Sequence, residues 1–288
     1  AILQYRLQND IDEYRFGAHY MPLTAESGFH SDVLFMLNMS SVKTDKDIQT
    51  YLEKLAAVPT YMQQQISWMQ QGLKTGYTQP KAVLAGYEDS IKSFISNDPT
   101  KSPFYRPLLK QPAGIDATRW QALQQQAKTL ISSQITPVYQ QYLDFFVGQY
   151  VPGARDNIAA VALPDGAAFY QNRLEHYTTL KLTPQQVHQT GLDEVKRIRA
   201  QMQQVIDQLG FTGSFAEFIQ YLRTDPQFYA KTPDELMRYA AYLAKKADAE
   251  LPKLFKTLPR TPYGVVPVPA EIAPKYTTGR YSGPTRDD

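Results

Sequence analysis

The chain has 288 residues, and its 30 lysines and arginines nearly balance its 28 aspartates and glutamates, for a formal net charge of +2. Because no basic block stands out, the charge pattern does not indicate a nucleic-acid partner. Hydrophobic residues make up 43% of the chain, as in ordinary globular proteins. No apolar run reaches the roughly 18 residues of a membrane span. The absence of cysteine excludes disulfides and thiolate sites.

The first hundred residues predict short amphipathic helices. Apolar residues recur with helical spacing over 1–15, 31–39, 44–59, 62–73 and 80–95, although a strand would also fit the pattern of 31–39. Thr44 is expected to cap the third of these helices and Pro59 to end it. Short turns between the last three predict an antiparallel bundle.

The middle of the chain predicts one long helix after an irregular connection. Residues 96–116 are rich in proline and polar residues and predict an ordered segment without helix. A helical stripe then runs over 117–150, and Pro137 is expected to break or kink that helix because it lacks an N–H donor. A turn at Pro164-Asp165-Gly166 precedes a further helix over 167–177.

Residues 178–210 carry the clearest helical signal. Thr183, Pro184 and Gln186 form a capping-box helix start, and Gly210 occupies the position of a C-terminal glycine cap. We expect the apolar stripe of this helix to be buried: Val187, Gly191, Val195, Ile198, Met202, Val205 and Leu209. Ser214 and Thr232 are expected to begin two more helices, the second with Leu236, Tyr239, Ala240, Leu243 and Ala247 facing inward.

The composition changes at Leu258, after which proline and glycine are too frequent for helix. The sequence therefore predicts a helical domain over 1–257 and a proline-rich extended segment over 258–288, with residues 263–268 extended along a sheet edge. Exposed backbone flanked by aromatic and basic side chains suits peptide binding by strand addition. The candidate substrate-binding residues are Arg260, Tyr263, Tyr276, Arg280 and Tyr281; a plain connecting loop is the alternative.

The order of several segments resembles a bacterial family, the domain-of-unknown-function 885 proteins. The resemblance is carried by LTPQQVHQTGLDEVKRIRAQM at 182–202, with YLEKLAAVP, YVPGARD, LPDGAAFY and LPRTPYGVVPVP in the same order along the chain. It implies a mostly helical, zincin-like fold, zinc-dependent peptidase activity, a lipoprotein and a periplasmic or cell-envelope location.

The zinc motif that the resemblance implies is not in this sequence. An H-E-x-x-H helix places two histidines one turn apart around a metal, with the glutamate as general base. Here the histidines are His19, His30, His176 and His188, and none has another four residues on. We therefore assign no catalytic or metal-binding residue to this chain, and we expect it to be an internal portion of a longer protein with the motif downstream.

The sequence thus predicts an all-α, multi-helix array with a small irregular or β-containing C-terminal segment. The leading functional hypothesis is the helical, substrate-enclosing portion of a zinc-dependent peptidase-like protein. In the complete protein, zinc-bound water would hydrolyse a peptide bond. The alternative is a non-catalytic helical binding or scaffold protein of the cell envelope.

Overall fold

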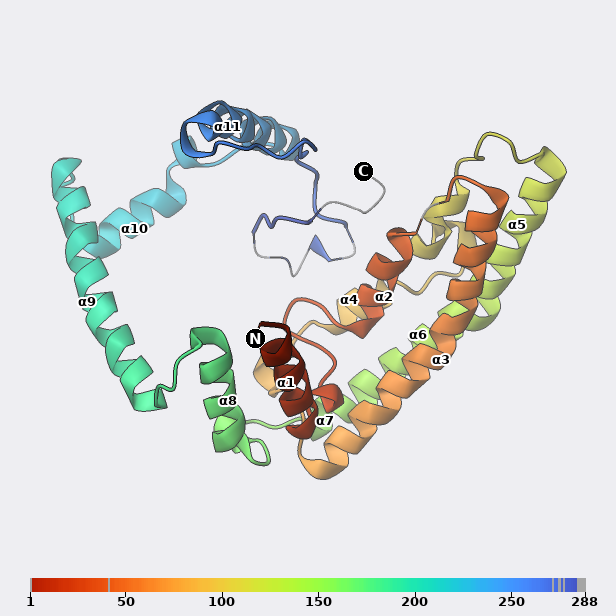
Figure 1. Cartoon of the computed structure of the whole chain (residues 1–288), viewed down its shortest axis with the longest axis horizontal. Helices are drawn as coiled ribbons and strands as arrows, with labels where there is room; N and C mark the ends of the chain where they lie inside the picture. The colour runs from red at the N-terminus through yellow and green to blue at the C-terminus, as the bar shows by residue number, and fades with distance from the viewer. Residues whose placement is uncertain (1, 41, 271, 274–275, 277, 284–288) are drawn as a thin grey trace. The chain divides into compact units, whose positions relative to one another are not determined.

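The structure is a computed structural model that describes residues 2–40, 42–270, 272–273, 276 and 278–283. It confirms the all-α, multi-helix array (Figure 1). Contacts divide the chain into two compact units. Unit 1 comprises Ala1–Tyr177 and Pro269–Gly279, and unit 2 comprises Thr178–Val268 and Arg280–Asp288. The predicted division at residue 258 stays a prediction.

Unit 1 is organised around α3 (Asp45–Thr75), a helix of 31 residues. Thr44 caps it through a capping box with Asp47, as the sequence predicts. The predicted break at Pro59 is wrong, because the helix continues through it. The loss of one backbone hydrogen bond is offset by an unbroken stripe of buried side chains on both sides of the proline, including Leu55, Val58 and Met62.

A second long helical run packs beside α3 (Figure 1). It consists of α5 (Ala117–Leu130), a π-helical segment (Ile131–Ile135), α6 (Thr136–Phe145), a second π-helical segment (Phe146–Tyr150) and α7 (Val151–Gly153). Pro137 lies in the first turn of α6, directly after the first π-helical segment. The wider π turn accommodates the missing N–H donor. The predicted break or kink at Pro137 is therefore a π-helical segment within a continuous helical run.

Shorter elements complete unit 1. They are α1 (Ile2–Arg15), α2 (Phe29–Asn38), α4 (Glu88–Lys92), α8 (Gly166–Thr178) and the 3₁₀ segments Ala18–Tyr20, Lys81–Val83, Pro99–Lys101, Pro103–Leu108 and Ala160–Ala162. The predicted helix over 80–95 is reduced to one short turn on each side of Gly86, whose φ of +70° interrupts it. The predicted antiparallel bundle is therefore wrong. Arg119 at the start of α5 lies 2.6 Å from Asp45 at the start of α3, so these helices run parallel.

The core of unit 1 is unusually aromatic. Tyr51 and Tyr139 are fully buried and donate hydrogen bonds of 2.7 Å and 2.6 Å to the backbone oxygens of Phe104 and His30. Because each hydroxyl finds an acceptor, the rings add apolar contact area without leaving these polar atoms unpaired. The other large and fully buried aromatic side chains are Tyr87, Phe94, Phe104, Tyr142, Phe146 and Tyr150.

Unit 2 contains α9 (Pro184–Gln208), α10 (Phe215–Thr224), the 3₁₀ segment Pro226–Phe228 and α11 (Pro233–Leu254). The predicted helix starts are confirmed. The Thr183 hydroxyl accepts a hydrogen bond from the Gln186 N–H, and the Ser214 and Thr232 hydroxyls accept from Glu217 and Glu235 in the same way.

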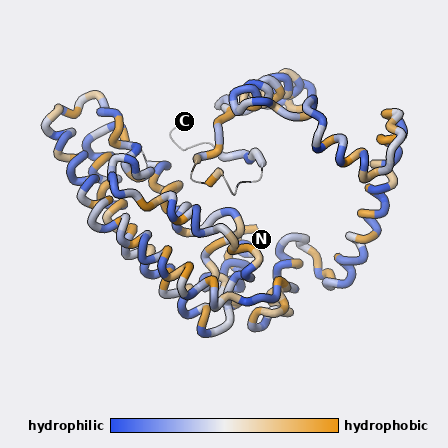
Figure 2. The backbone as a smooth tube through the Cα atoms, turned by 180° about the vertical axis from the view of Figure 1, so that it is seen from behind, coloured by the Kyte–Doolittle hydropathy of each residue, from blue (hydrophilic) through white to orange (hydrophobic). Residues whose placement is uncertain are grey.

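The predicted burial of the stripes in unit 2 is wrong. On α9, Val195 is 64% exposed and Leu209 is 67% exposed, and on α11 Leu236 and Tyr239 are also exposed. The hydropathy colouring of Figure 2 shows hydrophobic positions recurring along these helices. Only Ile206 of α9 is buried. Amphipathic spacing determines which side chains share a face, but burial also needs a second surface. No described segment of unit 2 covers these faces.

The described residues after α11 form no strand, so the sheet edge predicted for 263–268 is absent. The described part of the proline-rich segment is irregular, which is one of the two forms predicted for the C-terminal segment. Elsewhere the described residues make only isolated β-bridges, between Leu23 and Gly28 and between Pro80 and Arg155. None of the described helices is both long enough and apolar enough to cross a membrane.

Candidate ligand-binding site

The predicted substrate-binding residues are divided between the two units. Arg260, Tyr263, Arg280 and Tyr281 belong to unit 2, whereas Tyr276 belongs to unit 1. Tyr263 donates a 2.9 Å hydrogen bond from its hydroxyl to the Ala244 backbone oxygen, which fastens the proline-rich segment to α11.

Most of these side chains are exposed to solvent, as are most other residues of the proline-rich segment. Half of the Tyr263 side chain is exposed and Tyr281 is almost fully exposed. Arg260 is exposed as well. Their role in substrate binding stays a prediction.

The histidines do not fit a zinc site. His19 packs against the rings of Tyr14, Tyr20 and Trp68, with ring centroids 4.2, 4.0 and 5.4 Å away. His30 is fully buried, and burial lowers its pKa to about 3. Among the described residues, no three histidine, aspartate or glutamate side chains group as metal ligands. We therefore assign no chemistry to zinc within these residues.

The two remaining histidines lie on different helices, His176 on α8 and His188 on α9. His176 stacks on Tyr5, with parallel rings 6.1 Å apart. His188 is exposed on α9, and Glu194 is paired with Arg197 at 2.6 Å. His188 and Glu194 therefore do not form a catalytic pair.

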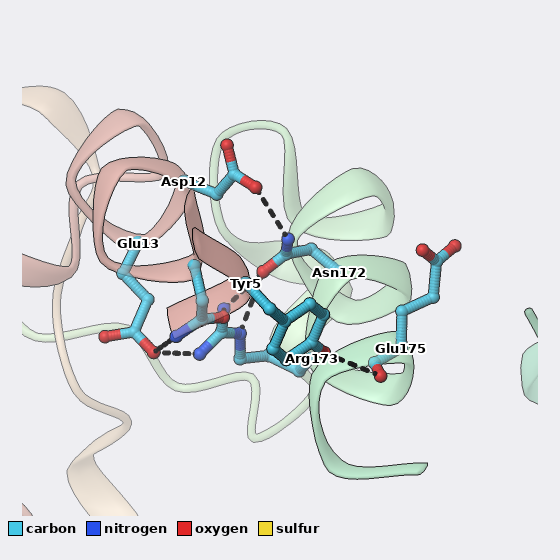
Figure 3. A network of polar contacts seen from close by, with 7 residues as sticks. Tyr5, Asp12, Glu13, Asn172, Arg173 and Glu175 are labelled. Atoms are coloured by element: carbon cyan, nitrogen blue, oxygen red, sulfur yellow. Dashed lines mark hydrogen bonds and ion pairs between the residues drawn. The ribbon is translucent and has the colours of Figure 1, made fainter. Parts of the chain in front are cut away.

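A polar cluster joins α1 to α8 (Figure 3). The nearly buried Arg173 donates to Glu13 and Asn172, and to the Asn9 side-chain oxygen at 2.6 Å. Tyr5 adds a 3.1 Å hydrogen bond to the Glu175 backbone oxygen. Because the guanidinium donors already have acceptors in the chain, this cluster holds two helices together and leaves little capacity for a ligand.

A recess of about 330 Å³ lies elsewhere in unit 1, between the segment 21–29, the start of α2 and the middle of α3. Asp32, Tyr61 and Gln65 contribute its polar side chains, and Met21, Leu23 and Phe29 contribute apolar surface. Sequence reasoning missed this site, since Asp32 and Gln65 are separated along the chain and match no motif. The signal that could have revealed it is Gln65, a polar residue in the buried stripe of α3.

The sequence matches the family described as bacterial protein of unknown function (DUF885) over residues 1–288. The chain belongs to this family. No curated protein matches the sequence.

A solved structure has a similar fold. The protein described as "the putative lipoprotein from Colwellia psychrerythraea" is 25% identical to this DUF885 chain, with a TM-score of 0.76. The match covers 88% of this chain and 44% of the Colwellia chain. This chain thus spans less than half the length of that relative.

Proposed function

We propose that this chain is the helical, substrate-enclosing portion of a zinc-dependent peptidase-like protein of the cell envelope. Further polypeptide would supply the metal ligands. The zinc and the peptidase activity rest on the family resemblance, and the envelope location also on the lipoprotein description of the Colwellia relative. The single observation that carries the proposal is the exposed apolar face of α9.

That face is too regular to be ordinary surface. The side chains are spaced three or four residues apart along the C-terminal part of α9 and its C-cap residue, and they are between 39% and 67% exposed: Val195, Ile198, Met202, Val205 and Leu209. Contiguous apolar surface of this kind marks contact with other polypeptide. The Colwellia chain is more than twice as long as the part that matches this chain. We therefore propose that the apolar face of α9 contacts polypeptide equivalent to the unmatched part of the Colwellia chain.

The proline-rich segment is the second part of the proposal. Arg260, Tyr263, Tyr276, Arg280 and Tyr281 would contact a peptide substrate, with the arginines pairing to a carboxylate and the tyrosine rings offering rigid surface. The hydrogen bond from Tyr263 to Ala244 supports this role because it tethers an otherwise irregular segment to a helix.

The test uses a DUF885 protein of the length of the Colwellia relative that contains this chain. We expect about one chelator-sensitive zinc per molecule and zinc-dependent cleavage of peptides. Tyr263→Ala and Arg280→Ala should each lower turnover or peptide affinity about tenfold, equivalent to about 1.4 kcal/mol. Arg223→Ala, on the exposed face of α10, is the matched control and should leave both unchanged.

A second candidate is a non-catalytic helical binding or scaffold protein of the cell envelope. It is favoured by the settings of the four histidines, because His19, His30 and His176 pack against aromatic rings and His188 is exposed on α9. The same experiment separates the two candidates. A long protein without zinc and without peptide cleavage would reject the peptidase and leave the scaffold.

A further inference from the structure

The recess in unit 1 has a rigid wall formed by residues 21–29. The Leu23–Gly28 bridge closes a short turn, in which the Thr24 N–H donates a 2.8 Å hydrogen bond to the Ser27 oxygen. The Gln79 side chain donates at 2.8 Å to the Leu23 oxygen and fastens this turn to the rest of the unit. At Gly28, an added Cβ would lie 2.4 Å from the Tyr87 hydroxyl, so the close packing there requires glycine. The recess is therefore preformed.

The floor of the recess carries an amide without a partner. Gln65 is 7% exposed, and its side chain makes no hydrogen bond with any part of the chain that the structure describes. Its amide atoms are not sealed from solvent, so they open into the recess. A ligand in the recess can therefore replace water as the hydrogen-bond partner of this amide.

The mouth of the recess carries a carboxylate without a counter-ion. Asp32 is exposed at the start of α2, and within the described residues it forms neither an ion pair nor a side-chain hydrogen bond. No lysine, arginine or histidine lines the recess. Partial burial raises the pKa of Asp32, and burial together with the Asp32 charge raises the pKa of Tyr61. Asp32 is therefore the one charged side chain among the residues that line the recess.

The remaining surface is apolar and aromatic. Met21 and Leu23 offer aliphatic contacts, and the rings of Phe29 and Tyr61 lie 6.4 Å apart in an edge-to-face arrangement. Aromatic rings attract cations as well as aliphatic groups. A cationic head beside Asp32 on a short apolar arm therefore matches both the charge and the lining of the recess.

We propose that this recess binds a primary ammonium group carried on a short aliphatic arm. The ammonium donates to the Asp32 carboxylate, and the Gln65 amide oxygen and the Tyr61 hydroxyl accept its other N–H bonds. The arm lies against Met21, Leu23 and Phe29. A lysine side chain of a peptide and a free alkylamine share this chemistry. The inference concerns unit 1 alone and does not depend on the proposed peptidase activity.

The test is titration of this chain, by calorimetry and by NMR chemical shifts, with n-butylamine, with Nα-acetyl-lysine-amide and with n-butanol. Both amines should bind at one site and n-butanol should not, because it lacks the charge. Tighter binding of the lysine derivative would identify a peptide side chain as the source, and tighter binding of n-butylamine a free amine. Asp32→Asn should weaken amine binding at least about tenfold.

Two further variants make the result decisive. Gln65→Met keeps the volume of the side chain and removes the amide, so it should weaken binding severalfold without unfolding the unit. Asp10→Asn removes an equal charge from an exposed position on α1 and should leave binding unchanged. Absence of amine binding to the folded wild type would overturn the proposal. Equal affinities of the Asp32 and Asp10 variants would overturn it as well.

Discussion

Units 1 and 2 show the same sequence pattern with opposite outcomes. The stripe of α3 in unit 1 is buried along its whole length, whereas the equally regular stripe of α9 in unit 2 is exposed from Val195 to Leu209. Both helices begin with a threonine capping box. The difference therefore lies beyond local helix formation, in whether a second apolar surface is present. Unit 1 has a core of its own, whereas the apolar faces of α9 and α11 find no covering surface within the described residues of unit 2.

The largest expected effect compares one leucine from each unit. Leu55 of α3 is 0% exposed and Leu192 of α9 is 52% exposed. Leu55→Ala should lower the free energy of unfolding by about 2–5 kcal/mol because it opens a cavity in the core. Leu192→Ala should change it by less than about 0.5 kcal/mol. Chemical denaturation measures both, and equal losses would show that α9 is buried in solution.

A smaller effect is expected for the buried hydroxyl of Tyr139. Tyr139→Phe removes the 2.6 Å hydrogen bond to the backbone oxygen of His30. The loss should be about 0.5–1.5 kcal/mol. Tyr239→Phe on the exposed face of α11 is the matched control and should be neutral. A neutral Tyr139→Phe would mean that the core of unit 1 is not as tightly packed as described.

The smallest effect concerns Asp32 and its dependence on pH. Because its pKa is raised in the folded state, its contribution to stability is present below the ordinary aspartate pKa and is lost as pH rises through the raised value. Asp32→Asn should therefore equal or slightly exceed the wild type in stability at pH 7, and the wild type should gain relative to the variant as the solution is acidified.

If Asp32 serves only to stabilise the start of α2, Asp32→Asn should change the stability at neutral pH in the opposite direction. An aspartate retained only for the dipole of α2 would stabilise the fold at neutral pH, by about 0.3–1 kcal/mol, and its replacement would be destabilising. The nearby Tyr61 and Tyr87 have raised pKa values and His30 a lowered one, so none of them changes charge between pH 5 and 8. Thermal melts of both proteins, from pH 8 down to the ordinary aspartate pKa, show whether Asp32→Asn stabilises or destabilises the fold at neutral pH and whether the wild type gains on acidification.

Much of the fold could be predicted from local signals. The caps at Thr44, Thr183, Ser214 and Thr232 depend on a few adjacent residues, and all were placed correctly. The continuation of α3 through Pro59 could not be predicted, because it depends on tertiary packing that outweighs a local penalty. The prediction that the α9 stripe is buried was wrong for the same reason, because burial also depends on tertiary packing.

The candidate site depends on tertiary structure even more strongly. Asp32 and Gln65 meet only because α2 packs on α3 and the turn at 23–28 closes against them. Aspartate at a helix start and glutamine in a helix are common in any sequence, so neither attracts attention alone. Their lack of partners becomes visible only once the neighbouring atoms are placed.

The most direct test of the central claim is amide hydrogen exchange, measured on this chain and on the whole Colwellia protein. We expect the amides of α9 and α11 in this chain to exchange at least about a hundredfold faster than those of α3, because their apolar faces lack a covering surface. The matching helices of the Colwellia protein should be protected like its counterpart of α3. Protection of α9 equal to that of α3 in this chain alone would contradict the account.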